Sequence, residues 1–242
     1  MRPLLRLLPL AALLATATVR AQAPADSKIA VRVVGGLNTL SLGEAAAFHQ
    51  SVADAYVAAG VPVPTQRSFP AGPLVGAEAL WSTGSGARFG VGARHTSSSA
   101  YSLYGDYAGT LDVVSHVSAL FVETVSLVEF KEGRAVRPFL GSRGGTVFAS
   151  SSTREALVLE SVSPIRSEVG GRGTGFSIEG FGGASVAAGP VDVFVQGGYR
   201  YARVARLSGD VQVGGQVVQE GDLPYRLGLS GWTGVVGLTL RR

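Results

Sequence analysis

The sequence has no cysteine, and only three of its 242 residues are histidine. Without cysteine the chain cannot hold a disulfide framework, a thiol nucleophile or a cysteine-ligated metal. His49 and His116 each stand alone, so no metal-ligand spacing can be recognised. The glycine-rich stretches 170–173 and 180–183 lack the Lys-Ser/Thr that follows a phosphate-binding loop. We therefore expect no metal and no cofactor.

Long apolar runs are also absent beyond the first residues, so hydropathy predicts no transmembrane helix. At the N-terminus, Arg2 and Arg6 flank the start of the short apolar run 7–15, and Ala21-Gln22-Ala23 supplies small residues suited to signal peptidase. We expect residues 1–23 to be a cleaved signal peptide and residues 24–242 to form one domain.

A basic cluster is missing as well. The chain has 21 basic and 17 acidic residues, but Arg2, Arg6 and Arg20 lie in the expected signal peptide, and the remainder is close to neutral. The basic stripe that a nucleic-acid surface requires is therefore absent, and we expect no nucleic-acid partner.

What the sequence does contain is alternation with a period of two, which is typical of β-strands. It marks eight stretches of about the length that a tilted strand needs to cross a bilayer. The phase changes near Glu123, which predicts a β-bulge there. The stretches are residues 28–40, 74–82, 87–96, 111–130, 136–148, 175–186, 191–202 and 231–240.

The connections between these stretches alternate in length. Short turns are expected at 83–86, 131–134 and 188–190, and long loops at 41–72, 97–109, 149–174 and 207–226. Short turns on one rim and long loops on the other are typical of outer-membrane barrels. The sequence therefore predicts an all-β fold, an antiparallel up-and-down transmembrane β-barrel of about eight strands, with both termini on the periplasmic side.

The first long loop carries a helix pattern over residues 43–59. Ser41 and Glu44 have the spacing of a capping box, in which each side chain bonds the other's backbone amide. Phe48, Val52 and Tyr56 then recur at helical spacing. We expect this helix to pack across one rim of the barrel.

Charged residues of both signs share the polar side of the expected strands. A charge facing hydrocarbon costs about 2–4 kcal/mol near the membrane midplane, whereas inward-facing charges can pair. Eight strands enclose a space that side chains nearly fill, so we expect a plugged polar lumen. The lumen charge network comprises Arg32, Glu78, Arg88, Arg94, Arg137, Arg143, Glu179, Asp192 and Arg200.

Aromatic residues lie toward the ends of the expected strands, where interfacial girdles form in membrane barrels. These interfacial aromatics are Trp81, Phe130, Phe148, Phe176, Tyr201 and Trp232.

Two short segments resemble a known family. Arg137-Pro138-Phe139-Leu140-Gly141 is similar to a segment of OmpW-like and related OmpX-like small outer-membrane β-barrel proteins, and the stretch 229–238 is similar to their last strand. The resemblance implies an outer-membrane location, reached through the periplasm, and partners that include the barrel-insertion machinery. Such proteins usually end on an aromatic residue, whereas this chain ends Leu240-Arg241-Arg242.

One constellation suits an alternative, enzymatic interpretation. His95 and Ser97 are two residues apart on one strand, on the face shared with Val91, and so point the same way. Outer-membrane lipid A deacylases look similar in outline, and Asp106 is a candidate for the acid that orients the histidine. The fuller family pattern is absent, since the sequence continues Ser97-Ser98-Ser99-Ala100.

The leading interpretation is a non-enzymatic barrel whose function lies in its loops or in a narrow passage for small molecules. Its expected partners are outer-membrane lipid and lipopolysaccharide, with an unidentified small-molecule or protein ligand at the loops. The alternatives are a lipid A-modifying esterase that uses His95 and Ser97, and a soluble periplasmic lipocalin-like binding barrel.

Overall fold

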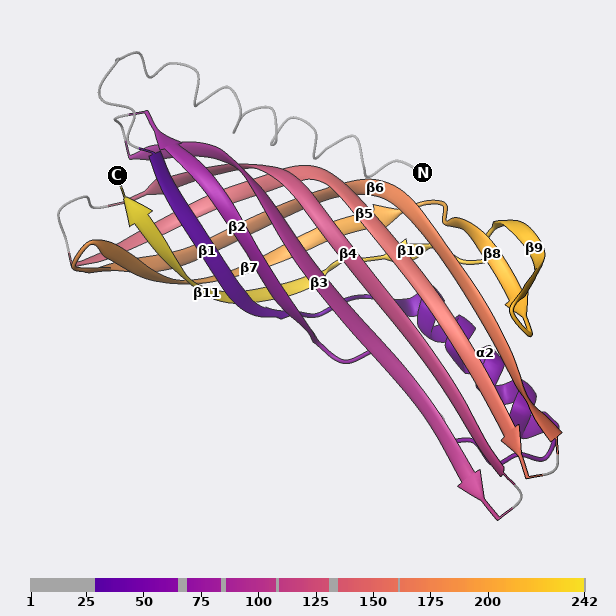
Figure 1. The fold of residues 1–242 in the computed structure, drawn as a ribbon. Helices are drawn as coiled ribbons and strands as arrows, with labels where there is room; N and C mark the ends of the chain where they lie inside the picture. Colours follow the sequence, from indigo (N-terminus) through magenta and orange to yellow (C-terminus); the bar gives the residue numbers. More distant parts are fainter. Residues whose placement is uncertain are drawn as a thin grey trace, which may run out of the picture.

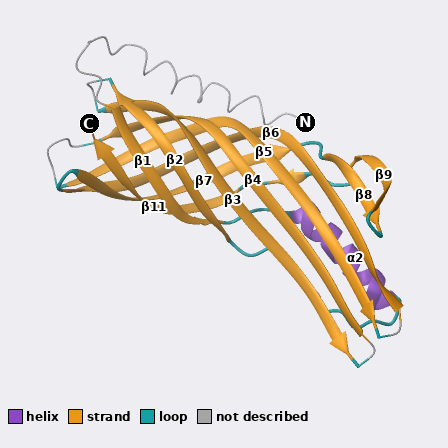
Figure 2. Ribbon diagram, in the orientation of Figure 1, coloured by secondary structure: helices purple, strands orange, loops and turns teal. Residues whose placement is uncertain are grey.

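The computed structural model describes residues 29–64, 69–83, 86–107, 109–130, 135–160 and 162–241. The expected signal peptide and the turn 131–134 lie outside the described residues. Within them the chain forms a closed antiparallel barrel that continues at one end into an open, curved sheet with a helix against it (Figure 1 and Figure 2).

Eight of the described strands close the ring, each pairing with its two neighbours, and this confirms the expected fold class. Closure occurs where the last strand pairs with both the first and the seventh strand of the ring, so the barrel has no free edge. In ring order the strands are β1 (Ile29–Asn38), β2 (Gly72–Ser82), β3 (Ala87–Asp106), β4 (Gly109–Glu129), β5 (Val136–Leu159), β6 (Val162–Ala188), β7 (Val191–Val204) and β11 (Gly231–Arg241).

The chain turns tightly at one end of the barrel. Between Ala188 and Val191 the turn passes through Gly189, whose φ of 67° lies in the left-handed region that glycine tolerates. At Thr83 the backbone N–H donates to the carbonyl of Ala87 at 3.1 Å. β1 begins and β11 ends at this same end (Figure 1), which we call the short-turn end.

At the opposite end β3, β4, β5 and β6 continue well past the other strands, forming what we call the extension (Figure 1). β3 and β4 stay paired as far as Asp106 and Gly109, and β5 and β6 as far as Leu159 and Val162. The expected loops 97–109 and 149–174 are therefore wrong, because both segments are strand almost throughout. Serine occurs on both faces there, as at Ser97 and Ser98, so apolar–polar alternation disappears although the backbone remains extended.

The segment expected as the loop 207–226 also contains strands. β8 (Ser208–Val213) pairs with the part of β6 that lies in the extension and with β9 (Gln216–Asp222). The short β10 (Leu227–Gly228) pairs with β7. The hairpin turns at Gly214 and Gly215, with φ values of 60° and 83°. Two consecutive left-handed residues form the type I′ turn that favours a two-residue hairpin.

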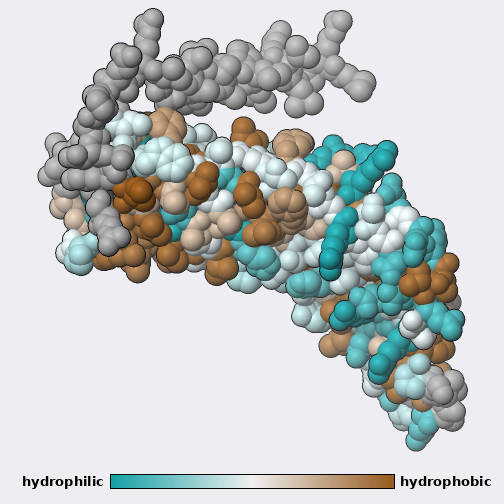
Figure 3. Space-filling view, turned by 45° about the horizontal axis from the view of Figure 1, so that its top comes forward, coloured by the Kyte–Doolittle hydropathy of each residue, from teal (hydrophilic) through white to brown (hydrophobic). Residues whose placement is uncertain are grey.

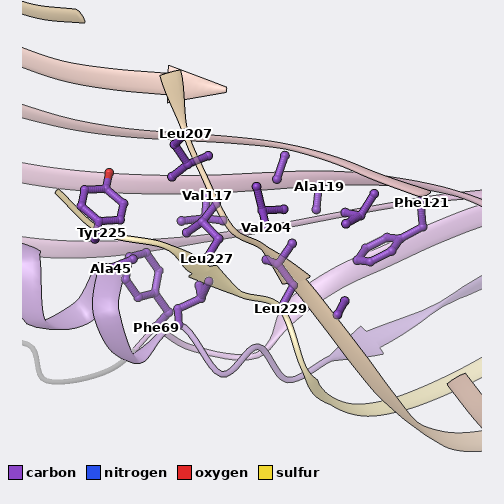
Figure 4. Close-up of a cluster of buried hydrophobic side chains, with 14 of the residues drawn as sticks. Ala45, Phe69, Val117, Ala119, Phe121, Val204, Leu207, Tyr225, Leu227 and Leu229 are labelled. Atoms are coloured by element: carbon purple, nitrogen blue, oxygen red, sulfur yellow. The ribbon is translucent and has the colours of Figure 1, made fainter. Parts of the chain in front are cut away.

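The polarity of the two strand faces reverses between the barrel and the extension. The inward face carries the charges in the barrel and apolar side chains in the extension. In the sequence, an apolar set on β4 alternates with Asp112 and His116, so the expected polar lumen would have placed the apolar set toward lipid. The structure buries that set inside, and Asp112 and His116 point outward; the set is Leu111, Val113, Val117 and Phe121. This correction has a simple cause. The extension has a helix on its inner face, so its apolar side chains turn inward to cover it (Figure 4).

The β-bulge expected near Glu123 is also wrong. The register between β4 and β5 runs without interruption from Phe121 opposite Val147 to Glu123 opposite Gly145. Glu123 faces inward in phase with Phe121; only the chemistry of the inward face changes there, from apolar to charged.

The helix α2 (Gly43–Ala58) occupies nearly the expected range, but the capping box is wrong. Leu42 is the N-cap residue and no side chain caps the helix. Ser41 instead donates its backbone N–H to the carbonyl of Ser230, and the Glu44 carboxylate accepts the backbone N–H of Arg226 at 2.7 Å. Both groups therefore tie the helix start to the chain before β11. No helix in the described ranges is long and apolar enough to cross a membrane.

Candidate functional site

All nine charged residues expected in the lumen are on the inward face of their strands, and all except the half-buried Arg88 are buried. They come from six strands of the ring, β1, β2, β3, β5, β6 and β7. Alternation places each of them inward, and closure of the ring then brings them together.

Glu179 on β6 is the centre of this network. Its two carboxylate oxygens accept hydrogen bonds from Arg94 at 2.8 and 3.2 Å, from Arg143 at 3.1 Å and from Arg200 at 3.0 and 3.1 Å. The Thr233 hydroxyl donates a further bond at 3.2 Å. With a residue exposure of 1 %, Glu179 is a buried charge whose compensation comes from three guanidinium groups.

Two further carboxylates complete the central network. Glu78 accepts from Arg143 at 2.7 Å and from Arg32 at 3.3 Å. Glu123 accepts from Arg94, with the Nη2 to Oε2 distance 2.5 Å, and from the Ser177 hydroxyl at 2.8 Å. The network therefore bridges the barrel from β1 and β2 to β6, across its interior.

Four phenylalanine rings lie against the arginines of this network. The guanidinium carbon of Arg32 lies 3.7 Å from the ring centre of Phe194, that of Arg143 lies 3.8 Å from Phe181, and that of Arg200 lies 3.8 Å from Phe121. Phe139 is a second ring for Arg32, at 5.2 Å. Cation–π contact suits a desolvated guanidinium because the ring face carries partial negative charge.

Inward glycines make the room for these rings. A Cβ at Gly141 would lie 2.4 Å from Phe181, and one at Gly237 would lie 2.5 Å from Phe194. Contacts that short require a shift of the ring, so glycine at these positions lets aromatic side chains and arginines fill a narrow barrel together.

Two more ion pairs lie closer to the short-turn end. Arg88 pairs with Glu129 at 3.1 Å, and Arg137 pairs with Asp192. The sequence interpretation did not include Glu123 or Glu129 in the network. Alternation could not place Glu123 in the lumen, because Glu123 is in phase with the apolar Phe121, whose side of the strand the sequence assigned to lipid.

Above the network, α2 closes the interior on the side of the extension. His49 on this helix is fully buried, with Nδ1 2.8 Å from the Ser115 hydroxyl and Nε2 3.0 Å from the Ser102 hydroxyl. The Ser115 hydroxyl also lies 2.8 Å from that of Thr153. Burial lowers the pKa of His49 from its ordinary value, so the neutral ring is favoured.

An apolar cluster surrounds this closure. It joins α2 to β4, β5, β7 and β10, and Figure 4 shows its side chains converging between the helix and the strands. Its larger members are Leu42, Phe69, Val117, Phe121, Val147, Leu207, Tyr225, Leu227 and Leu229. The interior is therefore filled by charged and aromatic side chains within the barrel and by a helix above them.

On the outer face, the six aromatic residues expected at the interfaces are all substantially exposed, between 42 % for Trp81 and 68 % for Trp232. Phe176 and Tyr201 contact each other with ring centres 5.7 Å apart. Trp232 contacts Tyr199 at 5.2 Å.

The residues proposed for the enzymatic alternative are not brought together as a triad. His95 is exposed on the outer face, and its Nε2 lies 3.1 Å from the hydroxyl of Ser118, which pairs opposite Ser97. Asp106 is at the tip of the extension, where it accepts from the Tyr104 hydroxyl and the Gly109 amide. From His95 to Asp106 the strand rises roughly 35 Å, far beyond the reach of a side chain.

His116 makes a similar contact, with Nδ1 2.9 Å from the Ser99 hydroxyl. Within the described residues, no group of three or more histidine, aspartate or glutamate side chains could hold a metal ion.

Comparison with solved structures gives matches of low similarity, and two of them serve as examples. Neisserial surface protein A matches with a TM-score of 0.40 and 13 % identity, over 90 % of this chain and 99 % of that one. Ail, the attachment invasion locus protein of Yersinia pestis, solved with the heparin analogue sucrose octasulfate, matches with a TM-score of 0.33 and 9 % identity, over 89 % and 97 %. No protein-family model and no curated protein matches the chain. The fold assignment rests on the strand pairing described above.

Proposed function

We propose that this protein is an integral outer-membrane β-barrel that does not conduct solutes, and that its working surface is the extension beyond the membrane. The observation that carries the proposal is the combination of an apolar outer surface with an interior filled by paired charges. A soluble barrel would have the opposite arrangement, with its apolar side chains inside and its charges in water.

The outer surface of the barrel supports membrane insertion. Large apolar side chains such as Val31, Leu140 and Val193 are between 42 % and 59 % exposed. Apolar side chains gather over the barrel and hydrophilic ones over the extension (Figure 3). Exposed apolar surface of this extent is stable where it faces lipid.

The spacing of the aromatic residues supports the same conclusion. Phe130 lies level with Pro138 of β5, to which its amide donates, and Phe148 lies further along that strand. At ~3.3 Å per residue and a tilt of ~45°, the distance from Pro138 to Phe148 is roughly 23 Å along the barrel axis. Outer-membrane barrels have an apolar band of about 25 Å between aromatic girdles.

The filled interior argues against the other functions considered. A passage for small molecules requires a continuous polar path, whereas the guanidinium groups of Arg94, Arg143 and Arg200 bridge the lumen to Glu179. A lipocalin-like protein requires a ligand cavity in the same place. The separation of His95 from Asp106 argues against the esterase, so we infer that the barrel is not an enzyme.

The test is fractionation with heat-modifiability, followed by planar-bilayer recording. We expect recovery from outer membranes only in detergent, a gel band that shifts on boiling, and no steady conductance. A freely soluble protein whose band does not shift would contradict membrane insertion. Steady conductance would contradict the closed interior and leave the membrane location standing.

A further inference from the structure

The outer face of the extension carries two adjacent, open and shallow hollows just beyond the aromatic residues Phe148 and Phe176, and together we call them the groove. The lower one, of about 530 Å³, is lined by Leu120, Phe148 and Thr174 together with Ser118, Ser150 and Arg172. The upper one, of about 410 Å³, shares Ser150 and Arg172 and continues along Ser152, Glu168, Gly170 and Asp210. The groove therefore runs from apolar to strongly polar lining.

Strand register gives the height of each part. Leu120, Phe148 and Thr174 form one row across β4, β5 and β6, and Ser118, Ser150 and Arg172 form the next outward-facing row away from the barrel. Phe148 and Phe176 belong to the expected aromatic girdle that is nearer the extension. Arg172 is four residues beyond Phe176 on β6, so its guanidinium lies where the headgroups of an outer leaflet begin.

Arg172 is an exposed cation, and among the described residues no carboxylate lies within ion-pair distance of it. The carboxylates of the upper hollow are already engaged, Glu168 with Arg154 at 3.0 Å and Asp210 with Gln212. The lining thus offers one unpaired guanidinium, a row of serine hydroxyls, and an apolar floor below. Guanidinium binds phosphate oxygens in a bidentate manner, and hydroxyls and carboxylates bond sugar hydroxyls.

We propose that this groove binds a phosphorylated glycolipid of the outer leaflet. Its phosphate is held by Arg172, its sugar lies along Ser150, Ser152 and Gly170, and an acyl chain lies over Leu120 and Phe148. The proposal rests on the proposed function, since it needs the barrel in an outer membrane with the extension outward.

Gly170 provides a test that leaves the backbone intact. It faces the groove, and a Cβ added there would meet only Ser152 Cβ at 3.8 Å and the Ser151 carbonyl at 3.9 Å, which are ordinary contacts. Gly170→Leu therefore fills the upper hollow without straining the strand, while Arg172→Gln removes the cation.

The experiment is a titration of the full mature protein in zwitterionic detergent micelles, followed by backbone amide shifts. The probes are diphosphoryl lipid A, dephosphorylated lipid A and phosphatidylglycerol. We expect diphosphoryl lipid A to shift the amides of residues 150, 152, 170 and 172. Loss of the phosphate, Arg172→Gln or Gly170→Leu should each weaken binding about tenfold, as expected for losing a charge-assisted contact or its space.

Two other outward arginines are matched controls. Arg166 lies on the same strand and face but beyond the groove, and Arg203 faces Phe176 from β7 near the aromatic level. Arg166→Gln and Arg203→Gln should change the affinity less than about twofold. Equal losses for all three arginines, or shifts spread around the whole barrel, would overturn the groove in favour of non-specific annular lipid.

Equal affinity for phosphatidylglycerol would overturn the sugar part of the proposal. Each variant is first checked for the heat-dependent band shift. A protein that shows this shift but no preference among the lipids disproves the groove alone, whereas a protein without it fails the proposed function itself.

Discussion

At the scale of single residues, Glu179 shows how a charge can be retained inside a small barrel. Its two oxygens receive hydrogen bonds from three arginines and one threonine, so the desolvation cost is offset by several close partners. The partners come from β3, β5, β7 and β11, which makes this carboxylate a tie between distant parts of the ring.

Replacing Glu179 by glutamine should therefore be strongly destabilising. The substitution keeps the shape of the side chain but leaves Arg94, Arg143 and Arg200 without their shared counter-charge. We expect a loss of about 3–5 kcal/mol in the free energy of unfolding, the range found when one partner of a buried pair is removed. Urea unfolding in lipid vesicles measures it.

Glu168→Gln is the matched control. Its partner Arg154 is on the same sheet, but the two side chains are 37 % and 69 % exposed. Exposed pairs contribute less than about 1 kcal/mol, so this variant should unfold close to wild type. An equal loss of unfolding free energy in the two variants would mean that the buried Glu179 stabilises the protein no more than an exposed ion pair does.

Burial of His49 between α2 and the extension disfavours the protonated form of its ring. Burial lowers the pKa of His49 below its ordinary value of about 6.5, so the unfolded or undocked segment binds a proton more readily than the docked helix does. Its stabilising contribution is complete above pH 6.5 and is lost as the pH falls through the lowered pKa.

We therefore expect α2 to become less protected from amide hydrogen exchange at pH 5 than at pH 7.5, after correction for the intrinsic exchange rate. His49→Gln should remove most of this difference. Glu155 also contacts the helix, through a 2.9 Å hydrogen bond from Tyr56, so Glu155→Gln serves as a second comparison. If only Glu155→Gln removes the pH effect, the assignment to His49 is wrong.

At the scale of elements, the strand extension and α2 depend on each other. The inner face of the extension is apolar, with Leu111, Val113 and Val117 fully buried, and α2 supplies Ala45 and Ala53 against it. A helix without a side-chain cap gains its stability from this packing rather than from its own sequence.

The contacts at the start of α2 predict different losses of stability for two substitutions. Ser41→Ala should have little effect, under about 0.5 kcal/mol, because the Ser41 side chain does not cap the helix. Glu44→Ala should cost about 1 kcal/mol, because its carboxylate accepts the amide of Arg226 at 2.7 Å. Amide exchange of residues 45–58 measures both. A larger loss from Ser41→Ala than from Glu44→Ala would mean that the Ser41 side chain caps the helix.

At the scale of the whole molecule, the side chains divide the chain into a lipid-facing barrel and a water-facing extension. The outward face is apolar along the barrel and becomes rich in serine, histidine and charge beyond Phe148 and Phe176. The inward face changes in the opposite direction, from charged to apolar, because water is outside the extension and a helix is inside it.

The absence of cysteine allows a direct test of orientation with single-cysteine variants. Tyr107, 94 % exposed at the tip of the extension, should be labelled as Tyr107→Cys by an impermeant maleimide on intact cells. Ala188→Cys, at the short-turn end, should be labelled only after the outer membrane is permeabilised, and Val193→Cys, facing lipid, poorly in both cases. Labelling of Ala188→Cys on intact cells would mean that the short-turn end, and not the extension, faces the outside of the cell.

The sequence by itself determined the features that depend on local periodicity. Alternation is a property of neighbouring residues, so the eight strands and the inward direction of Arg32, Glu78 and Glu179 could be predicted from it. Helical spacing is equally local, and it predicted the helix after Leu42. The Gly214-Gly215 turn was an equally local signal, but it was hidden inside a segment interpreted as a loop.

Only the tertiary structure decided which side of β4 is inside and which charges pair. Leu111 and Val113 alternate in the same way whether lipid or a helix covers them, and α2 is what reverses the assignment. Likewise, Arg94 and Glu179 are 85 residues apart, and they meet because ring closure and register bring their strands to one level. Pairing across a closed barrel depends on these long-range constraints, which the residues around each charge do not encode.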